Sequence, residues 1–286
     1  MSARGRLFGW GILLVPLAVS VALFVGPLAQ LFMISLREPS SSELYGTGWT
    51  LANYAQLAED DFIARIVWRT MWTSFLVLGC ALVIGYPVAW RIARMPPRKR
   101  SLVLLALLFP LMVSNVVRAY GWVAILGRRG VVNTTLQQAG VIDFPMALLF
   151  TPEAVVMGLL TILLPYMVIS IANALATLDP RYEEAAASLG AGPIRSFIHV
   201  VFPLSAPGVA SGALLVFLLT LSAYVTITLL GGPRSKLLVS LVYDSVVAFQ
   251  WPQAAALAFV LLALALATCG LILAVLRPGR VQGGAR

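Results

Sequence analysis

Side chains that perform enzymatic or metal chemistry are rare and scattered in this chain. It has one histidine, His199, and two cysteines, Cys80 and Cys269, which lie in apolar stretches where a free thiol behaves as a small apolar group. It contains no H-E-x-x-H motif, no G-x-S-x-G elbow and no G-x-x-x-x-G-K-[ST] phosphate loop. We therefore expect no metal site, no enzymatic activity and no ATP hydrolysis by this chain alone.

Arg118 is the one charged residue inside a long apolar stretch, and an intramembrane charge is a candidate functional residue. Tyr120 and Trp122 follow it, and Tyr224 lies in a later apolar stretch. These four are candidates for a translocation path or gate. Because Arg118 lies about 25 Å along a helix that starts near Ser101, its guanidinium could instead reach the outer interface as an anchor. The sequence leaves both roles open.

The elements that would carry these residues are membrane helices. The 286 residues are 60% hydrophobic and 11% charged, whereas soluble domains carry about 25% charged residues, so a soluble fold is excluded. Six apolar stretches reach the roughly 20 residues that cross a bilayer. We predict an all-α integral membrane protein, one domain over residues 1–286, with helices at about 7–36, 68–92, 101–126, 154–178, 206–230 and 252–276.

The distribution of charge predicts the orientation of these helices. With the N-terminus inside, 12 of the 20 basic residues and 3 of the 11 acids face the cytoplasm, while 7 basic residues and 8 acids face outward. Such a bias predicts that both termini are cytoplasmic. Basic residues beside the membrane favour the anionic inner leaflet, so the net charge of +9 needs no nucleic-acid partner.

The loop at 179–205 is long for a helical bundle and carries its own folding signals. Asp179 is suited to cap a helix with Pro180 at its first position, and Gly190 or Gly192 can end it. Pro193 can start a second short helix. We expect two short helices joined at a glycine turn.

Prolines and small residues mark the neighbouring stretches. Pro203 and Pro207 are expected to break the chain ahead of the fifth membrane helix. Pro110 is expected to kink the third membrane helix, and the pair Gly208 and Gly212 forms a GxxxG motif that favours close helix packing.

The loop has a characteristic spacing. Glu184-Ala185-Ala186 is followed by three residues, then Gly190, then nine residues, then Val200-Val201-Phe202-Pro203. This pattern resembles the cytoplasmic motif of ABC importer permeases, which has Glu-Ala-Ala, a glycine, and Ile-x-Leu-Pro at the same spacing. Val200 and Phe202 replace Ile and Leu. In addition, 116–133 and 222–232 resemble the spermidine/putrescine-type branch of that superfamily.

The resemblance implies a type I ABC importer permease fold with a cytoplasmic coupling helix in a bacterial inner membrane. It implies two ATP-binding subunits that bind ATP and Mg, a second permease subunit that is a different chain, and an extracytoplasmic solute-binding protein. By position, the residues expected to dock on the ATPase are Glu183, Glu184, Ala185, Ala186, Gly190 and Pro203.

One departure from the polyamine-type branch concerns the solute. Permeases of that branch tend to carry acids in the segment occupied here by Ser222, Ala223 and Thr228, and no Asp or Glu lies inside any predicted span. The sequence predicts a small polar solute, which can be a polyamine, an amino-acid-like compound or another small organic solute. Because a polycation needs carboxylates along its route, this departure favours a neutral, zwitterionic or anionic solute.

Other functions fit the sequence less well. An ion-coupled secondary transporter would need an intramembrane acid, and an intramembrane enzyme would need a catalytic motif. An amphipathic helix lying on the inner leaflet would set Glu183 and Glu184 against anionic lipid and would leave the spacing unexplained.

Overall fold

The computed structural model describes residues 3–40 and 43–276, and the described residues are mostly helical, with an isolated bridge between Arg37 and Trp49. In chain order the elements are α1 (Ala3–Ser35), α2 (Ala52–Glu59), α3 (Asp61–Ala93), α4 (Pro97–Leu108), η1 (Phe109–Met112), α5 (Asn115–Leu126), α6 (Val131–Gln138), α7 (Pro152–Ala176), α8 (Arg181–Ser188), α9 (Pro193–Ser196), η2 (Phe197–Val201), α10 (Phe202–Leu221), α11 (Tyr224–Gly231), η3 (Pro233–Ser235), α12 (Leu238–Val247) and α13 (Trp251–Val275).

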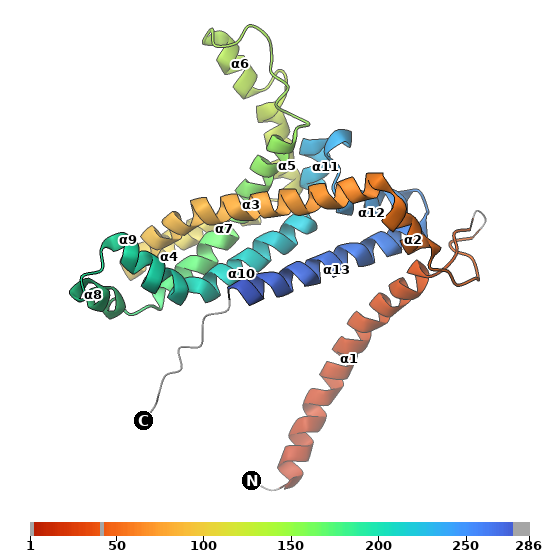
Figure 1. Ribbon diagram of the computed structural model, residues 1–286, viewed down its shortest axis with the longest axis horizontal. Helices are drawn as coiled ribbons and strands as arrows, with labels where there is room; N and C mark the ends of the chain where they lie inside the picture. The colour runs from red at the N-terminus through yellow and green to blue at the C-terminus, as the bar shows by residue number, and fades with distance from the viewer. Residues whose placement is uncertain (1–2, 41–42, 277–286) are drawn as a thin grey trace. The chain divides into compact units, whose positions relative to one another are not determined.

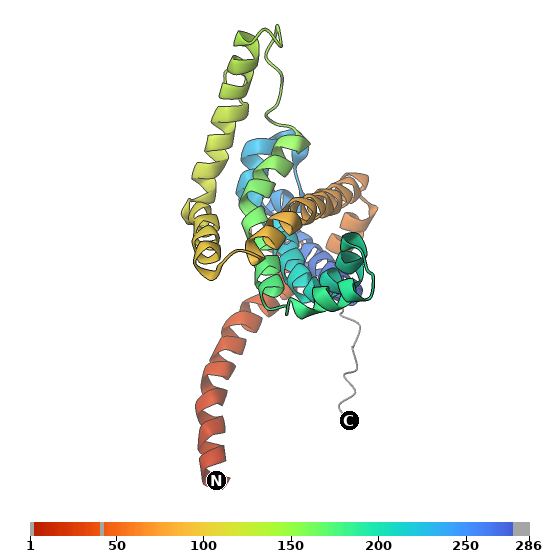
Figure 2. The same ribbon diagram turned by 90° about the vertical axis from the view of Figure 1, so that its left-hand side faces the viewer.

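Five helical stretches in the described chain are long and apolar enough to cross a membrane. They are the second part of α1, then α3, α7, the stretch from α9 to the end of α10, and α13. A sixth span results if α4 and α5–α6, which bend by 86° at their junction, are counted as one (Figure 2). The predicted all-α membrane fold is confirmed.

The third predicted span, 101–126, is broken. α4 gives way to a 3-10 turn that contains Pro110, and Val113 and Ser114 then take extended conformations with ψ of 132° and 137°. Proline removes a backbone donor and crowds the preceding turn, which explains why the helix breaks where a kink was expected. The prediction of one continuous helix here is wrong.

The fifth predicted span, 206–230, also differs from the structure. α10 starts earlier, at Phe202, and ends at Leu221, and α11 is a separate helix. Between them the N–H of Tyr224 donates to the carbonyl of Ser222 at 2.8 Å, closing a turn in which Ala223 has a ψ of 50°. α11 then packs against α5 and α7, which explains why the helix does not continue straight.

Contacts divide the chain into two compact units, one of Met1–Ala64 with Leu241–Leu261 and one of Arg65–Ser240 with Leu262–Arg286. Each is described by itself. The single membrane domain expected from the sequence stays a prediction.

In the first unit, polar side chains tie the end of α1 to α2. The buried Asn53 side-chain amide donates to the carbonyls of Ser35 at 2.9 Å and Arg37 at 2.8 Å. The hydroxyls of Ser35 and Tyr54 lie 2.7 Å apart, and the Arg37 guanidinium stacks 4.1 Å from the centre of the Trp49 ring. These contacts fix how the chain leaves the first span.

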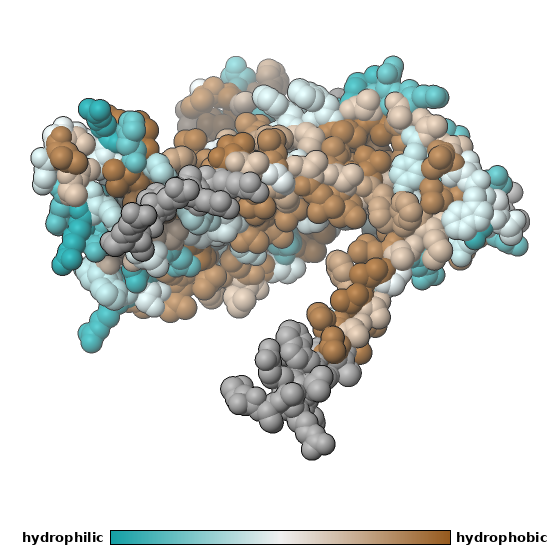
Figure 3. Space-filling model, turned by 60° about the horizontal axis from the view of Figure 1, so that its bottom comes forward, coloured by the Kyte–Doolittle hydropathy of each residue, from teal (hydrophilic) through white to brown (hydrophobic). Residues whose placement is uncertain are grey.

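Over residues 16–33, α1 presents apolar side chains outward. Leu17, Leu23 and Phe24 are exposed, and in Figure 3 apolar residues cover the described part of this helix on the face shown. At its end, the rings of Phe32 and Phe259 meet edge to face, 5.2 Å between centres. An apolar exposed surface of this kind suits hydrocarbon.

In the second unit, the central contact is between α7 and α10, which run side by side (Figure 1). A Cβ added at Gly208 would come within 2.3 Å of the Cβ of Ala174 and 2.9 Å of the Ser170 carbonyl. One added at Gly212 would lie 2.8 Å from the Met167 sulfur. The expectation of close helix packing at this GxxxG pair is confirmed.

We expect Gly208→Ala to destabilise the protein by about 1–3 kcal/mol, because backbone atoms of α7 would have to move away from the new methyl group. The measurement is unfolding in detergent, followed by circular dichroism. Gly79→Ala in α3 is the matched control, since nothing lies within 4 Å of its Cβ position. Equal stability of the two variants would contradict this account of the contact.

Candidate functional site

The first short helix of the loop, α8, has the predicted cap. The N–H of Arg181 donates to the Asp179 carboxylate at 2.9 Å, and Pro180 already has helical angles, φ −55° and ψ −24°. Asp179 thus satisfies a donor that would otherwise be free at the helix start, and the carboxylate favours the positive end of the helix dipole. This prediction is confirmed.

At its other end, α8 closes with a glycine turn. Gly190 has a φ of +80°, its N–H donates to the Ala187 carbonyl at 2.9 Å, and the next N–H, of Ala191, donates to Ala186 at 3.0 Å. Two reversed bonds of this kind form a Schellman motif, which a residue with a Cβ adopts only under strain. The structure thereby selects Gly190 rather than Gly192 as the residue that ends the helix.

The two faces of α8 differ. Ala186 is buried, whereas Glu184 and Ala185 are exposed. No described group bonds the Glu184 carboxylate. The same loop also exposes large apolar side chains, namely Tyr182 at 55%, Leu189 at 89%, Ile194 at 76% and Ile198 at 52%. We call these exposed residues of the loop, Tyr182, Glu184, Ala185, Leu189, Ile194 and Ile198, the docking face.

The second short helix is not separate, which corrects the sequence-based expectation. α9 leads through the π turn η2 directly into α10, so Pro193–Leu221 forms one stretch of 29 residues. Within it the N–H of Phe202 donates to the Phe197 carbonyl, five residues back. This wider turn accommodates Pro203, whose ring would otherwise clash with the preceding turn. Pro207 lies inside α10 and does not break it.

An ion pair joins α8 to the end of α3. The Nη2 of Arg94 lies 2.6 Å from both carboxylate oxygens of Glu183, and the same guanidinium stacks 4.0 Å from the centre of the Trp90 ring. Beside it is a hollow of about 630 Å³, lined by residues of α3, α7, α8 and the start of α10. Glu183 therefore differs from its neighbour Glu184 in having a partner within the chain.

The second candidate site lies at the broken third span. The Arg118 Nη2 donates to the carbonyl of Pro110 and, at 3.1 Å, to that of Val113. Its Nη1 is enclosed and has no hydrogen-bond partner in the described structure. Arg118 thus binds two carbonyls at the break, of which that of Pro110 also accepts the Val113 N–H at 3.2 Å, and it points back along its own span rather than outward.

A hollow of about 180 Å³ adjoins Arg118, and none of its lining residues is an acid. Its polar side chains are Asn115, Arg118, Tyr166, Ser222, Tyr224 and Thr226. Of the four candidates, the structure brings Arg118 and Tyr224 together here. Tyr120 is exposed, and the Trp122 ring nitrogen donates to the Thr161 hydroxyl at 3.1 Å, so neither lines this hollow.

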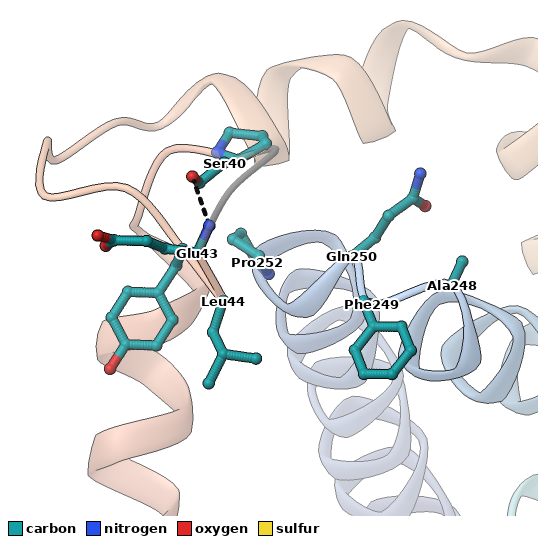
Figure 4. A pocket seen from close by; sticks show the side chains of 9 residues that line it. Ser40, Glu43, Leu44, Ala248, Phe249, Gln250 and Pro252 are labelled. Atoms are coloured by element: carbon teal, nitrogen blue, oxygen red, sulfur yellow. Dashed lines mark hydrogen bonds between the residues drawn. The ribbon is translucent and has the colours of Figure 1, made fainter.

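A third hollow, of about 820 Å³, lies in the first unit (Figure 4). Ser40, Glu43 and Leu44 approach it from the segment after α1, and the Glu43 N–H donates to the Ser40 hydroxyl at 3.1 Å. Phe249 and Gln250 approach from the turn between α12 and α13, where Phe249 has a φ of +57° and is 71% exposed. Within residues 3–40 and 43–276, no group of three or more His, Cys, Asp or Glu could hold a metal ion.

Residues 45–278 match the protein family described as binding-protein-dependent transport system inner membrane component. The chain belongs to this family. It is 35% identical over 209 residues to the spermidine/putrescine transport system permease protein PotB of Escherichia coli (strain K12), covering 73% of this chain and 76% of the relative. It is 32% identical over 220 residues to PotB of Haemophilus influenzae, covering 77% of each.

Among solved structures, the permease is similar in fold to a chain of a bacterial alginate ABC transporter in complex with an alginate pentasaccharide-bound periplasmic protein. The TM-score is 0.77 at 18% identity, over 96% of this chain and 95% of that chain. The type I permease fold expected from the sequence is thus confirmed, as is a multi-pass inner-membrane permease of a binding-protein-dependent ABC importer, related to the polyamine-type branch.

Sequence reasoning missed Arg94 and Trp90 of the permease. Both lie on α3 or directly after it, far in sequence from the loop, so no motif pointed to them. The signal that could have found them is their spacing: Tyr86, Trp90 and Arg94 recur every fourth residue and therefore share one helix face.

We expect Arg118→Met to loosen the break in the third span. It removes two hydrogen bonds from a charged donor at the break, leaving the Pro110 carbonyl with the Val113 N–H alone, so amide exchange over residues 111–117 should accelerate by about tenfold. Hydrogen–deuterium exchange with mass spectrometry measures this. Arg129→Met, in an exposed turn, is the control, and unchanged exchange in Arg118→Met would contradict the bonding described.

Proposed function

We propose that residues 179–205 dock this permease on the ATP-binding subunits of its importer. The observation that carries the proposal is the docking face, which combines an acid without a partner in the described chain, on a helix capped at both ends, with exposed apolar side chains of the same loop. Leu189 is 89% and Ile194 is 76% exposed, and large exposed apolar side chains on one loop are typical of a surface that binds a partner. Glu184, Ala185, Ala186, Gly190 and Pro203 would shape this contact, whereas Glu183 would act within the chain.

The proposed orientation places both termini and the docking face in the cytoplasm. The positive-inside bias of the loops supports it, because 12 basic residues and 3 acids then lie on that side. The hollow beside Glu43 and Phe249 then faces outward, where the extracytoplasmic solute-binding protein would meet the permease.

The partners follow from this arrangement. Two ATP-binding subunits, each holding ATP and Mg, would close on the docking faces of this permease and of a second, different permease chain. Their closure would displace α8, and with it α7 and α10, which flank the loop. The cavity between the two permeases would then open to the other side of the membrane.

The proposed solute is neutral, zwitterionic or anionic, although the relatives named above are spermidine/putrescine permeases. Arg118 and Tyr224 line a hollow without any acid, and a polycation would meet an unbalanced guanidinium there. We propose these two residues as contacts along the path, with Tyr120 and Trp122 at its edge.

We expect Glu184→Lys to abolish ATP-driven uptake and to weaken co-purification of the ATP-binding subunits by about tenfold or more. The glutamate would pair with basic groups of the ATP-binding subunit in the buried contact, whereas a lysine there would repel them. Insertion into the membrane should not change. The assay is affinity purification of the complete transporter, followed by ATP hydrolysis and uptake in proteoliposomes.

Glu59→Lys, an equal charge reversal at the exposed end of α2, is the matched control and should leave docking intact. Normal uptake by Glu184→Lys would count heavily against the docking role. Transport by the permease in liposomes without any ATP-binding subunit would overturn the proposed function altogether.

The solute class can be tested with four-carbon compounds that differ in charge. We expect 4-aminobutyrate or succinate, but not putrescine, to bind the cognate solute-binding protein and to stimulate ATP hydrolysis by the complete transporter. Isothermal titration calorimetry gives the binding. If only putrescine and spermidine stimulate ATP hydrolysis, the transporter carries a polycation although no acid lines the hollow beside Arg118, and the proposed solute class is wrong.

A further inference from the structure

Three side chains of the α3 region face the segment that leads from α8 to α10. Tyr86, Trp90 and Arg94 are spaced by four residues and therefore form a stripe along one helix face. All three belong to the second unit, as do their partners. We call these three residues the α3 stripe.

Tyr86 and Trp90, the first two residues of the α3 stripe, contact η2 and the start of α10. The hydroxyls of Tyr86 and Ser205 share a buried hydrogen bond of 2.8 Å. The Tyr86 ring meets Phe197 edge to face at 5.3 Å and Phe202 at 5.8 Å, and Trp90 meets Phe197 at 6.4 Å. Phe197 and Phe202 bound the π turn, so α3 holds α10 at the point where its hydrogen-bond pattern changes.

Arg94, the last residue of the α3 stripe, contacts α8. Arg94 contacts both carboxylate oxygens of Glu183 and stacks on Trp90 at the same time. Arg94 and Glu183 are each more than a third exposed, and an isolated pair at such exposure adds little to stability. The guanidinium nonetheless contacts the Trp90 ring of α3 and the Glu183 carboxylate of α8 at once, which suits a positioning role.

α8 is joined covalently to α7 and, through α9 and η2, to α10, but α3 has no such connection to it. A displacement of α8 would therefore move α7 and α10 through the chain itself. Only non-covalent contacts could make α3 follow.

We propose that the α3 stripe carries the motion of the docking segment to α3, with Arg94 as the positioning residue that keeps α8 and the end of α3 together during the transport cycle. This inference rests on the proposed docking function of residues 179–205. The whole of α3 then moves with α7 and α10 when the ATP-binding subunits close, and Glu183 serves this internal contact while Glu184 serves the external one.

The direct test is a distance measurement in the complete transporter in nanodiscs. Spin labels are placed at Arg91→Cys and Ser188→Cys after Cys80 and Cys269 are replaced by Ala, and the distance is measured without nucleotide and in the state trapped with MgATP and vanadate. We expect the same distance in both states, and two different distances when Arg94→Gln is added. A distance that changes without Arg94→Gln, or stays constant with it, would overturn the proposal.

Charge reversal gives a second readout. Arg94→Glu and Glu183→Arg should each lower the stimulation of ATP hydrolysis by the binding protein by about fivefold or more, a common size for coupling between sites, and the double variant should restore it. Arg94→Lys should keep most of the stimulation, and Arg91→Glu, on the same helix end, is the matched control. Rescue by the swapped pair shows that the two residues act through their contact, and a merely structural role would leave the stimulation of ATP hydrolysis unchanged in single variants that still assemble with their partners.

Co-purification of the ATP-binding subunits separates the two proposals. If the ATP-binding subunits bind the parent protein, but the Arg94 and Glu183 variants show the parent's distances and stimulation of ATP hydrolysis, the transmission role of the α3 stripe is wrong and docking stands. If the subunits do not bind the parent protein, docking itself fails.

Discussion

The contact between α7 and α10 is the interaction on which the rest of the second unit depends. Gly208 and Gly212 let the two backbones approach so closely that a methyl group at either position would overlap its neighbours. In a bilayer, where apolar side chains gain little by leaving lipid, close packing of this kind is a main source of helix association. Because α7 and α10 flank residues 179–205, their contact also fixes where this loop leaves the two helices.

The broken third span follows a related constraint. Backbone groups in hydrocarbon must find partners, and a break leaves carbonyls without helical donors. Arg118 supplies donors to two carbonyls at the break, so a charge that is costly in the membrane finds polar partners there. The hollow beside Arg118 is lined by residues of η1, α5, α7, α10 and α11, so the break brings this arginine to a place where several helices meet.

Local signals predicted much of this permease, since hydropathy located the spans and Asp179 and Gly190 marked both ends of α8. Contacts between distant segments escaped prediction. The π turn before Pro203 and the separate α11 depend on how α10 packs, and the Arg94–Glu183 pair joins residues 89 apart in sequence. A proline predicts a disturbed helix, but it does not reveal whether the chain bends, breaks or widens one turn.

The docking face also has a consequence for the fate of unassembled subunits. Leu189 and Ile194 are largely exposed beside the glycine turn that ends α8. In the proposed orientation, a permease chain made in excess of its partners would therefore expose an apolar surface to the cytoplasm. Chaperones and membrane proteases select such surfaces. The same residues that promote assembly would thus mark orphan copies for removal and keep the amounts of the subunits in balance.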